Sequence, residues 1–145
     1  MKKINVRIVN KSINKLPAYS KIGDAGMDIR ANKEVEIPAG KTVAVETGVY
    51  VQIPPGYQIQ VMSRSGLAYN SQIFVLNAPG IIDSGYRGEL KVILHNVSNK
   101  EFTVKLGDRI AQLVLQKAPQ IKWVEVDKLP DSGRGVGGIG HTGVK

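Results

Sequence analysis

An aspartate and a tyrosine lie three residues apart in a glycine-rich segment, residues 80–89, between two apolar runs. The carboxylate of Asp83 could act as a general base in a cleft, and the ring of Tyr86 offers a flat face for a sugar or a base. The same segment also suits an ordinary hairpin turn, with Asp83 bonded to its own backbone and Gly85 at positive φ. Taken alone, the hairpin turn is the more common meaning of this pattern.

Side chains that suit phosphate oxygens occur at two other places. Ser63 and Arg64 directly precede the stretch from Ser65 to Gln72. The residue types of this stretch predict a helix of at most two turns, capped by Ser63 or Ser65. An arginine at the start of a helix favours an anion, although an N-cap beside a solvated arginine explains the pattern equally well. Gln112 is a polar residue in an otherwise apolar strand pattern, so it is either exposed at a sheet edge or a ligand contact.

If the protein binds a metal ion, its ligands are oxygen atoms, because cysteine and paired histidine ligands are missing from the sequence. The chain has no cysteine, and His95 and His141 lie far apart in the sequence, which argues against a zinc site. Asp28 lies in an acidic turn that enters a strand pattern and could orient water molecules on a bound Mg²⁺. Lone aspartates at such places more often only form turns.

The last fifteen residues, 131–145, contain six of the sixteen glycines and have no apolar periodicity. A flexible terminus is the simplest interpretation. A P-loop is rejected because His141 replaces the lysine and the chain ends before a helix could follow. A weaker phosphate hypothesis remains, since glycines let backbone N–H groups approach an anion and Arg134 offers a bidentate guanidinium.

The elements that must position these residues are strands, because the apolar residues alternate with polar ones. None of the seven prolines falls inside an alternating run. Short, closely spaced strands with one short helix predict an all-β sandwich or barrel. The alternating pairs or triplets are Ile4, Val6 and Ile8; Val35 and Ile37; Val43 and Val45; Val49 and Val51; Ile59 and Val61; Leu90, Val92 and Leu94; Phe102 and Val104; Ile121 and Trp123.

The overall composition indicates one domain that can bury a core and attract polyanions. The chain has 145 residues, 42% of them hydrophobic, and a formal net charge of +8. The apolar run at the N-terminus is broken by Asn5 and Arg7, so it is too short for a signal peptide, and no segment approaches a membrane span. We therefore expect a soluble, cytoplasmic protein with a folded region at 1–130 and a flexible lid at 131–145.

Five segments in a fixed order closely resemble the ordered motifs of the trimeric deoxyuridine triphosphatase (dUTPase) family. The resemblance implies a distorted jelly-roll-like fold and a homotrimer whose three active sites each use motifs from all three subunits. It also implies Mg²⁺-assisted hydrolysis of dUTP to dUMP and pyrophosphate, which keeps uracil out of DNA and supplies dUMP for dTTP synthesis. The segments are A-G-M-D-I-R-A from residue 25, S-R-S-G-L-A from 63, N-A-P-G-I-I-D-S-G-Y-R-G-E from 77, K-L-G-D-R-I-A-Q-L from 105 and R-G-V-G-G-I-G-H-T-G from 134.

The same resemblance implies roles for individual residues. Asp83 corresponds to the general base that orients and deprotonates the water attacking the α-phosphorus, and Asp28 corresponds to a residue that acts through Mg²⁺-bound waters. Tyr86 would lie beneath the deoxyribose and leave no room for a 2′-hydroxyl. The uracil would be read by Asn77, Gly80, Ile82 and Ile139, and the phosphates would be held by Arg64, Ser65, Gly66, Gln112, Arg134, Gly138, His141 and Thr142.

Two residues of the glycine-rich tail depart from the family pattern. Ile139 stands where the family usually has a phenylalanine that stacks on uracil, which would remove about 1–3 kcal/mol of stacking energy. Val136 stands where a serine or threonine is frequent. We expect the chemistry to be retained and the contribution of the tail to be reduced.

Three other functions are compatible with parts of the sequence. A regulatory protein on the same fold would bind the nucleotide without cleaving it. A dCTP deaminase shares the fold, but the N-A-P-G-I-I-D segment and the glycine motif match the hydrolase branch. A sequence-independent nucleic-acid binder would suit the charge, yet five tyrosines, two phenylalanines and one tryptophan, not interleaved with basic residues, do not form a stacking surface. We expect neither a nucleic-acid nor a membrane partner.

Overall fold

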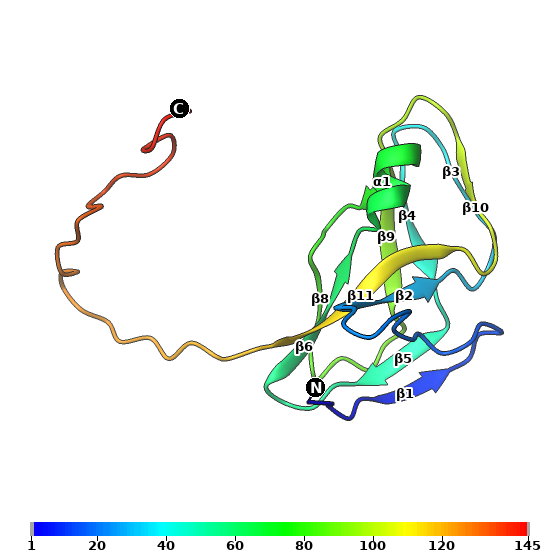
Figure 1. The fold of residues 1–145 in the computed structure, drawn as a ribbon, viewed down its shortest axis with the longest axis horizontal. Helices are drawn as coiled ribbons and strands as arrows, with labels where there is room; N and C mark the ends of the chain where they lie inside the picture. Colours follow the sequence, from blue (N-terminus) through cyan, green and yellow to red (C-terminus); the bar gives the residue numbers. More distant parts are fainter. Residues whose placement is uncertain (1, 145) are drawn as a thin grey trace.

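A computed structural model describes residues 2–144 as a folded body of eleven strands and one helix, followed by an extended C-terminal segment (Figure 1). Most of the alternating runs lie in strands, but Ile4 and Val6 precede the first strand, and the strands at 26–30, 73–75, 80–82 and 109–117 lie outside those runs. In chain order they are β1 (Arg7–Asn10), β2 (Gly26–Arg30), β3 (Val35–Ile37), β4 (Thr42–Glu46), β5 (Val49–Gln52), β6 (Tyr57–Met62), α1 (Ser65–Ser71), β7 (Ile73–Val75), β8 (Gly80–Ile82), β9 (Lys91–Asn96), β10 (Phe102–Val104) and β11 (Arg109–Lys117).

The strands form a four-stranded sheet in the order β2-β11-β6-β8, a three-stranded sheet in the order β4-β9-β7, and the two pairs β1-β5 and β10-β3. All neighbouring strands are antiparallel. Most neighbours are distant in sequence, as in a jelly roll and not in a series of hairpins. Across residues 2–144 the strands do not close into a barrel, so the open, jelly-roll-like form of the prediction is the one observed.

The core consists of the inward-facing residues of these strands. In β9, for example, Val92 and Leu94 are buried while Lys91 is exposed, because successive side chains of a strand point to opposite faces. Burial of each aliphatic side chain contributes about 1.5–3 kcal/mol. The core residues are Ile29, Ala31, Ile37, Val45, Val49, Val51, Ile53, Ile59, Val61, Ile73, Val75, Leu90, Val92, Leu94, Val104, Ile110, Ala111 and Leu113.

Asn96 is a buried polar residue that joins three segments of the body. Its side-chain amide donates to the carbonyl oxygens of Ile37 at 2.9 Å and Lys100 at 2.7 Å, and its Oδ1 accepts from the backbone N–H of Ser98 at 2.9 Å. A buried amide costs free energy unless its hydrogen bonds are made, and here they are. This residue therefore ties the end of β9 to the end of β3 and to the turn before β10.

The helix lies where the sequence predicts it, but its N-terminus differs. The N-cap residue is Arg64, and no side chain caps the first turn, so the predicted cap by Ser63 or Ser65 is wrong. The hydroxyl of Ser63 instead accepts a hydrogen bond from the backbone N–H of Val75 at 2.9 Å. Ser63 therefore joins the end of β6 to β7 and is not available to the helix.

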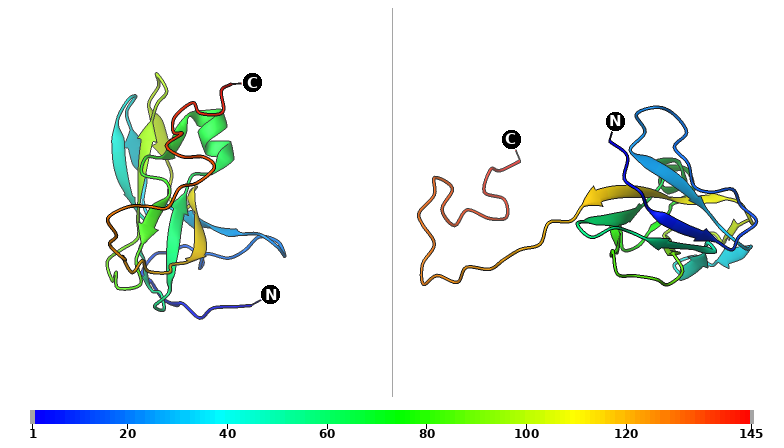
Figure 2. Two further views of the ribbon diagram at one scale, coloured as in Figure 1. Left: turned by 90° about the vertical axis from the view of Figure 1, so that its left-hand side faces the viewer. Right: turned by 90° about the horizontal axis from the view of Figure 1, so that it is seen from below.

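The chain leaves the body after β11, and the predicted strand at Ile121 and Trp123 is wrong. Both residues lie in an extended segment without strand pairing, and the side chain of Trp123 is 84% exposed. Figure 1 and the right-hand view of Figure 2 show this segment running away from the sheets. Alternation of apolar and polar residues predicts an extended chain, but it does not say whether a partner strand lies beside that chain.

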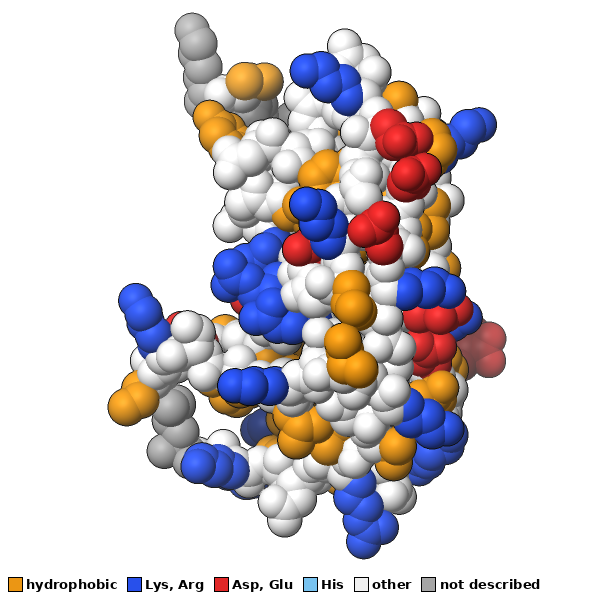
Figure 3. Space-filling model, turned by 90° about the vertical axis from the view of Figure 1, so that its right-hand side faces the viewer, with side chains coloured by type: hydrophobic (Ala, Val, Ile, Leu, Met, Phe, Trp, Pro, Cys, Tyr) orange, Lys and Arg blue, Asp and Glu red, His pale blue; other side chains and the backbone are white. Residues whose placement is uncertain are grey.

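The body carries charges of both signs at its surface, and Figure 3 shows basic and acidic side chains close together on one face. Within residues 2–144, no helix is long and apolar enough to cross a membrane.

Candidate active site

The first group of candidate residues lies where three strands of the four-stranded sheet run side by side. Gln112 of β11 pairs with Asp28 of β2 on one side and with Met62 of β6 on the other. Two residues beyond Met62, the chain reaches Arg64 at the start of α1. The long-range pairing of these strands therefore brings Asp28, Arg64 and Gln112 together, as the predicted phosphate and metal site requires.

Two arginines bind the carboxylate of Asp28. Arg64 Nε donates to Oδ1 at 2.9 Å, and Arg109 Nη1 donates to Oδ2 at 3.2 Å. Arg64 Nη1 also donates to the carbonyl oxygen of Arg109 at 3.1 Å. The Asp28 and Arg64 side chains are only 23% and 24% exposed, whereas Arg109 is 51% exposed. The ion pairs hold the Arg64 guanidinium in place and leave most of its five N–H donors for an anion.

This arginine group borders open space. Asp28, Arg30 and Arg109 line part of a hollow of about 620 Å³ beneath the loop of residues 12–20. Arg64 and Arg109 line a smaller hollow of about 220 Å³. Ser65 and Gly66 begin the helix beside Arg64 and are exposed. The structure thus brings together four predicted phosphate residues, Arg64, Ser65, Gly66 and Gln112, and adds Arg109, which the sequence did not indicate.

The second group surrounds Asp83 at the end of β8. Asp83 is exposed, and its carbonyl oxygen accepts a hydrogen bond from the backbone N–H of Tyr86 at 3.1 Å, which closes a tight turn. Gly85 does not have positive φ, and β8 pairs with β6 and not with the following strand, so the predicted hairpin with a left-handed glycine is wrong. Asn77 packs over Gly80, where an added Cβ would lie 3.1 Å from the Asn77 amide nitrogen.

Tyr86 is held flat against the following residues of its own loop. Its hydroxyl donates to the carbonyl oxygen of Glu89 at 2.9 Å, and its ring covers Gly88 so closely that a Cβ there would overlap it. Arg87 Nη1 donates to the carbonyl oxygens of Ser84 and Tyr86, at 2.7 Å and 2.9 Å. This loop therefore presents an exposed carboxylate next to a fixed aromatic face. Sequence reasoning missed Gly88 and Arg87, although both lie in the predicted segment.

The first and second groups are far apart within one chain. Ile82 pairs with Ile59, which places Asp83 opposite Gln58, while Arg64 follows the other end of the same strand. Six residues of extended chain span roughly 20 Å, at about 3.3 Å per residue. The backbones of Asp83 and Arg64 are therefore well separated within one chain.

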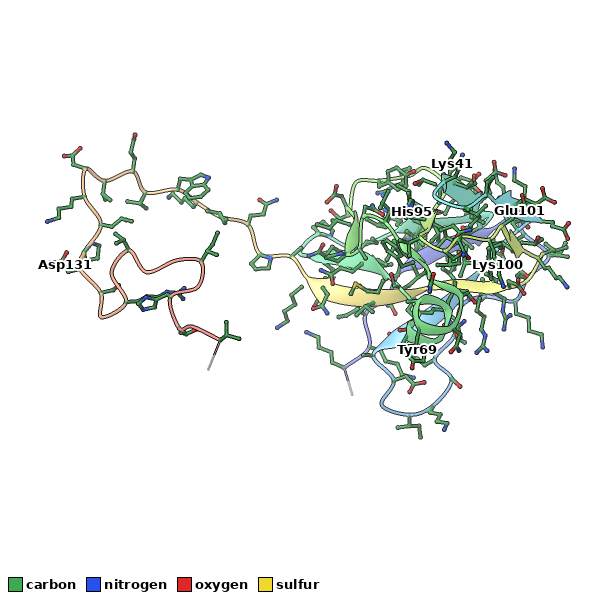
Figure 4. The ribbon with its side chains drawn as sticks, turned by 90° about the horizontal axis from the view of Figure 1, so that it is seen from above. Lys41, Tyr69, His95, Lys100, Glu101 and Asp131 are labelled. Atoms are coloured by element: carbon green, nitrogen blue, oxygen red, sulfur yellow. The ribbon has the colours of Figure 1, made fainter. Side chains whose placement is uncertain are left out.

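The third group is the glycine-rich tail. In the described part of the tail, residues 131–144, no hydrogen bond reaches the body. Arg134 Nε donates to the carbonyl oxygen of Gly137 at 2.8 Å, and the backbone N–H of His141 donates to Gly138 at 3.1 Å. Ile139 and Thr142 are fully exposed. Figure 4 shows Asp131, at the start of the tail, well away from Tyr69 on α1 and His95 on β9.

A divalent ion fits the first group only in the company of a ligand that supplies more oxygen atoms. Within residues 2–144, no three His, Cys, Asp or Glu side chains gather into a metal-binding cluster. Asp28 is one carboxylate between two guanidinium groups. Mg²⁺ commonly binds through one or two carboxylates together with substrate phosphates and water molecules, so the donor set suits an ion that arrives with a phosphate ligand.

Comparisons with known proteins identify the family of the chain. The dUTPase family model matches residues 13–143. Deoxyuridine 5′-triphosphate nucleotidohydrolases of Fusobacterium nucleatum and Finegoldia magna are both 48% identical to the chain. The first covers 99% of each chain, and the second covers 97% of this chain and 99% of the relative.

Solved structures show the same fold. A variant of the Staphylococcus bacteriophage 80alpha dUTPase with dUpNHpp matches with a TM-score of 0.89 and 24% identity, over 98% of this chain and 100% of that chain. A variant dUTPase of phage phi11 of S. aureus, described with a structural Mg(II) ion, matches with a TM-score of 0.81 and 22% identity, over 88% and 100% of the two chains. The family model and the curated relatives span nearly the whole sequence, and the chain belongs to the dUTPase family.

Proposed function

We propose that this protein is a dUTP diphosphatase that cleaves dUTP to dUMP and pyrophosphate by attack of water on the α-phosphorus. The observation that carries the proposal is the division of the functional side chains into a carboxylate-tyrosine loop and an arginine-glutamine group. The loop suits the nucleoside part of a deoxynucleoside triphosphate, and the arginine-glutamine group suits its phosphates. The named hydrolases that are 48% identical over nearly the full length support the same reaction.

In this proposal the residues around Asp83 act on the nucleoside end. Asp83 orients a water molecule and takes its proton, because an exposed carboxylate at the tip of a braced turn can reach a bound ligand. Tyr86 lies under the deoxyribose and leaves no room for a 2′-hydroxyl. Asn77, Gly80, Ile82 and, from the tail, Ile139 contact the uracil.

The arginine group acts on the phosphates. Charge neutralisation and in-line positioning dominate phosphoryl chemistry, so Arg64 and Gln112 with Ser65 and Gly66 would hold the phosphate oxygens. Asp28 would hold Mg²⁺ through water molecules, and the bound ion would supply neutralisation of the negative charge on the phosphates. Arg134, Gly138, His141 and Thr142 close over the γ end, and the ordered tail excludes bulk water.

A homotrimer with shared sites is part of the proposal. The separation of roughly 20 Å between the backbones of the two groups within one chain supports a site that a second copy completes. Apolar side chains of the extended segment support a partner surface, since exposed apolar patches usually mark interfaces. These exposed residues are Ile121, Trp123, Val124, Val126 and Leu129.

We also place the protein in the cytoplasm. The absence of cysteine from all 145 residues is in keeping with a reducing compartment.

The test is a nucleotide panel with Mg²⁺ and product analysis. We expect dUTP to give dUMP and pyrophosphate, with far slower cleavage of UTP, dTTP and dCTP. Binding of dUTP without products would favour the alternative, a regulatory protein on the same fold. Ammonia released from dCTP would favour a deaminase.

A further inference from the structure

Arg109 has no role in the proposed chemistry, yet it makes one of the two ion pairs to Asp28. Its Nη1 lies 3.2 Å from Oδ2, while Arg64 Nε lies 2.9 Å from Oδ1. One guanidinium therefore donates to each oxygen of the carboxylate. The same carboxylate is the residue that the proposed function assigns to the waters of Mg²⁺.

The charge of this group opposes binding of a cation on its own. Asp28 contributes −1, and Arg64 and Arg109 contribute +1 each, so the three side chains carry a net +1. Arg30 adds a further positive charge beside them, because it pairs with Arg109 in the sheet. The repulsion of a divalent cation by two positive charges within hydrogen-bond distance of Asp28 exceeds its attraction by the one carboxylate. The same net charge attracts a triphosphate.

We propose that Arg109 is a positioning residue that keeps Asp28 paired in the free protein. A triphosphate then draws the Arg109 guanidinium toward its oxygens, and Oδ2 of Asp28 becomes available to metal-bound water. The divalent ion consequently binds together with the nucleotide and not before it. This inference rests on the proposed function, because it assumes that phosphates occupy the arginine group.

The side chain of Arg109 can be tested apart from its backbone. Its carbonyl oxygen accepts a hydrogen bond from Arg64 Nη1 at 3.1 Å, and a substitution leaves that acceptor in place. The residue stands at an irregularity of the β2-β11 pairing and its side chain is half exposed, so Arg109→Gln leaves the core unchanged. A melting curve that matches the native protein within a few degrees verifies that the fold is retained.

Arg30 is the matched control. It lies opposite Arg109 in the sheet, and its Nη1 donates to the carbonyl oxygen of Gly107 at 2.7 Å and not to Asp28. Arg30→Gln therefore removes the same charge from the same neighbourhood without breaking an ion pair to Asp28. Arg109→Lys is the second control, because it keeps the charge and can keep one contact with Oδ2.

The experiment measures Mn²⁺ affinity of the nucleotide-free protein by the EPR signal of the unbound ion. We expect weak binding to the native protein and to Arg109→Lys. Arg109→Gln should bind Mn²⁺ about threefold more tightly than Arg30→Gln, the scale that one half-exposed ion pair supports. Equal affinities of the two glutamine variants would overturn the proposal.

A second titration includes an uncleavable α,β-imido analogue of dUTP at saturation. We expect the native protein and Arg109→Gln to converge in Mn²⁺ affinity, because the phosphates have then displaced the pairing. A threefold difference that persists with the analogue would also overturn the proposal.

These results are distinguishable from failure of the proposed function. Mn²⁺ binding to the free protein does not depend on turnover. Suppose that the native protein leaves dUTP uncleaved, that Arg109→Gln binds Mn²⁺ more tightly, and that the analogue abolishes this difference in affinity. The assigned reaction then fails, and the proposed role of Arg109 stands. If dUTP is cleaved and the affinities do not differ, only the role of Arg109 fails.

Discussion

Asp28 and Gln112 lie directly opposite each other across the β2-β11 pair, although they are separated by more than half of the chain. Because residues opposite each other in a sheet share one face, the carboxylate and the amide lie on the same face of the sheet. The residue predicted to bind the metal and the one predicted to bind the phosphates therefore belong to one surface. Strand register determines where that surface lies.

Replacement of Asp83 by asparagine should separate binding from chemistry. The carboxylate is exposed, and asparagine preserves its shape but cannot accept a proton at neutral pH. We expect turnover of dUTP to fall by a factor of about 10² or more, with dUTP binding largely retained. Single-turnover rates and equilibrium binding measure the two effects, and an unchanged rate would remove Asp83 from the mechanism.

Gly88→Ala should disturb the deoxyribose face without touching the ligand. A Cβ at residue 88 overlaps the ring of Tyr86, so the ring must move. We expect kcat/KM for dUTP to fall about tenfold and the preference for dUTP over UTP to shrink, because small misplacements at a reacting centre are costly.

Gly85→Ala is the matched control for this change, since a Cβ there meets nothing within 4 Å and Gly85 does not have positive φ. Steady-state kinetics with both nucleotides measure the effect. If both alanine variants behave alike, the packing of Tyr86 on Gly88 does not set sugar choice.

Truncation before Asp131 should lower turnover and leave the body stable. The hydrogen bonds of residues 131–144 lie within the tail, so its removal breaks no hydrogen bond of the core. We expect a melting temperature within about 2 °C of the full chain and a clear loss of kcat. Undiminished turnover would mean that the tail does not contribute to turnover in this protein, in which position 139 is an isoleucine.

Asn96→Ala should destabilise the fold, because it removes three hydrogen bonds that a buried side-chain amide makes to backbone groups. The carbonyl oxygens of Ile37 and Lys100 and the N–H of Ser98 would each lose a hydrogen bond. We expect a loss of about 2–4 kcal/mol in the free energy of unfolding, measured by urea titration. Asn99→Ala, at an exposed position of the same turn, should change it by less than about 0.5 kcal/mol.

The single tryptophan reports on the extended segment. Trp123 is 84% exposed in one chain, and no other tryptophan contributes to the fluorescence. If copies associate through this segment, its emission should shift to shorter wavelength and its quenching by acrylamide should fall as protein concentration rises. Emission typical of water at every concentration, in a sample that is trimeric by sedimentation, would place the interface elsewhere.

The alternation of apolar residues was sufficient to predict most strands, since a half-buried strand requires it. The same signal was misleading at Ile121 and Trp123, because an exposed arm can alternate as regularly as a paired strand. The motifs located Asp83, Arg64 and Gln112. They did not reveal Arg109, whose partner Asp28 is 81 residues away, because an ion pair between distant strands leaves no local pattern. Gly88 was overlooked because its importance depends on where one aromatic ring lies.

The length of strand β6 separates the Arg64 group from the Asp83 loop within each chain. One end of the strand leads to Arg64 and the other lies beside the loop of Asp83, so in the proposed trimer its length would set the distance between these two groups of each chain. Inserting a single residue into β6 would both lengthen that distance and turn half of the strand's side chains to the opposite face. Mutations at β6 that preserve its apolar character but not its length would thus uncouple folding from catalysis.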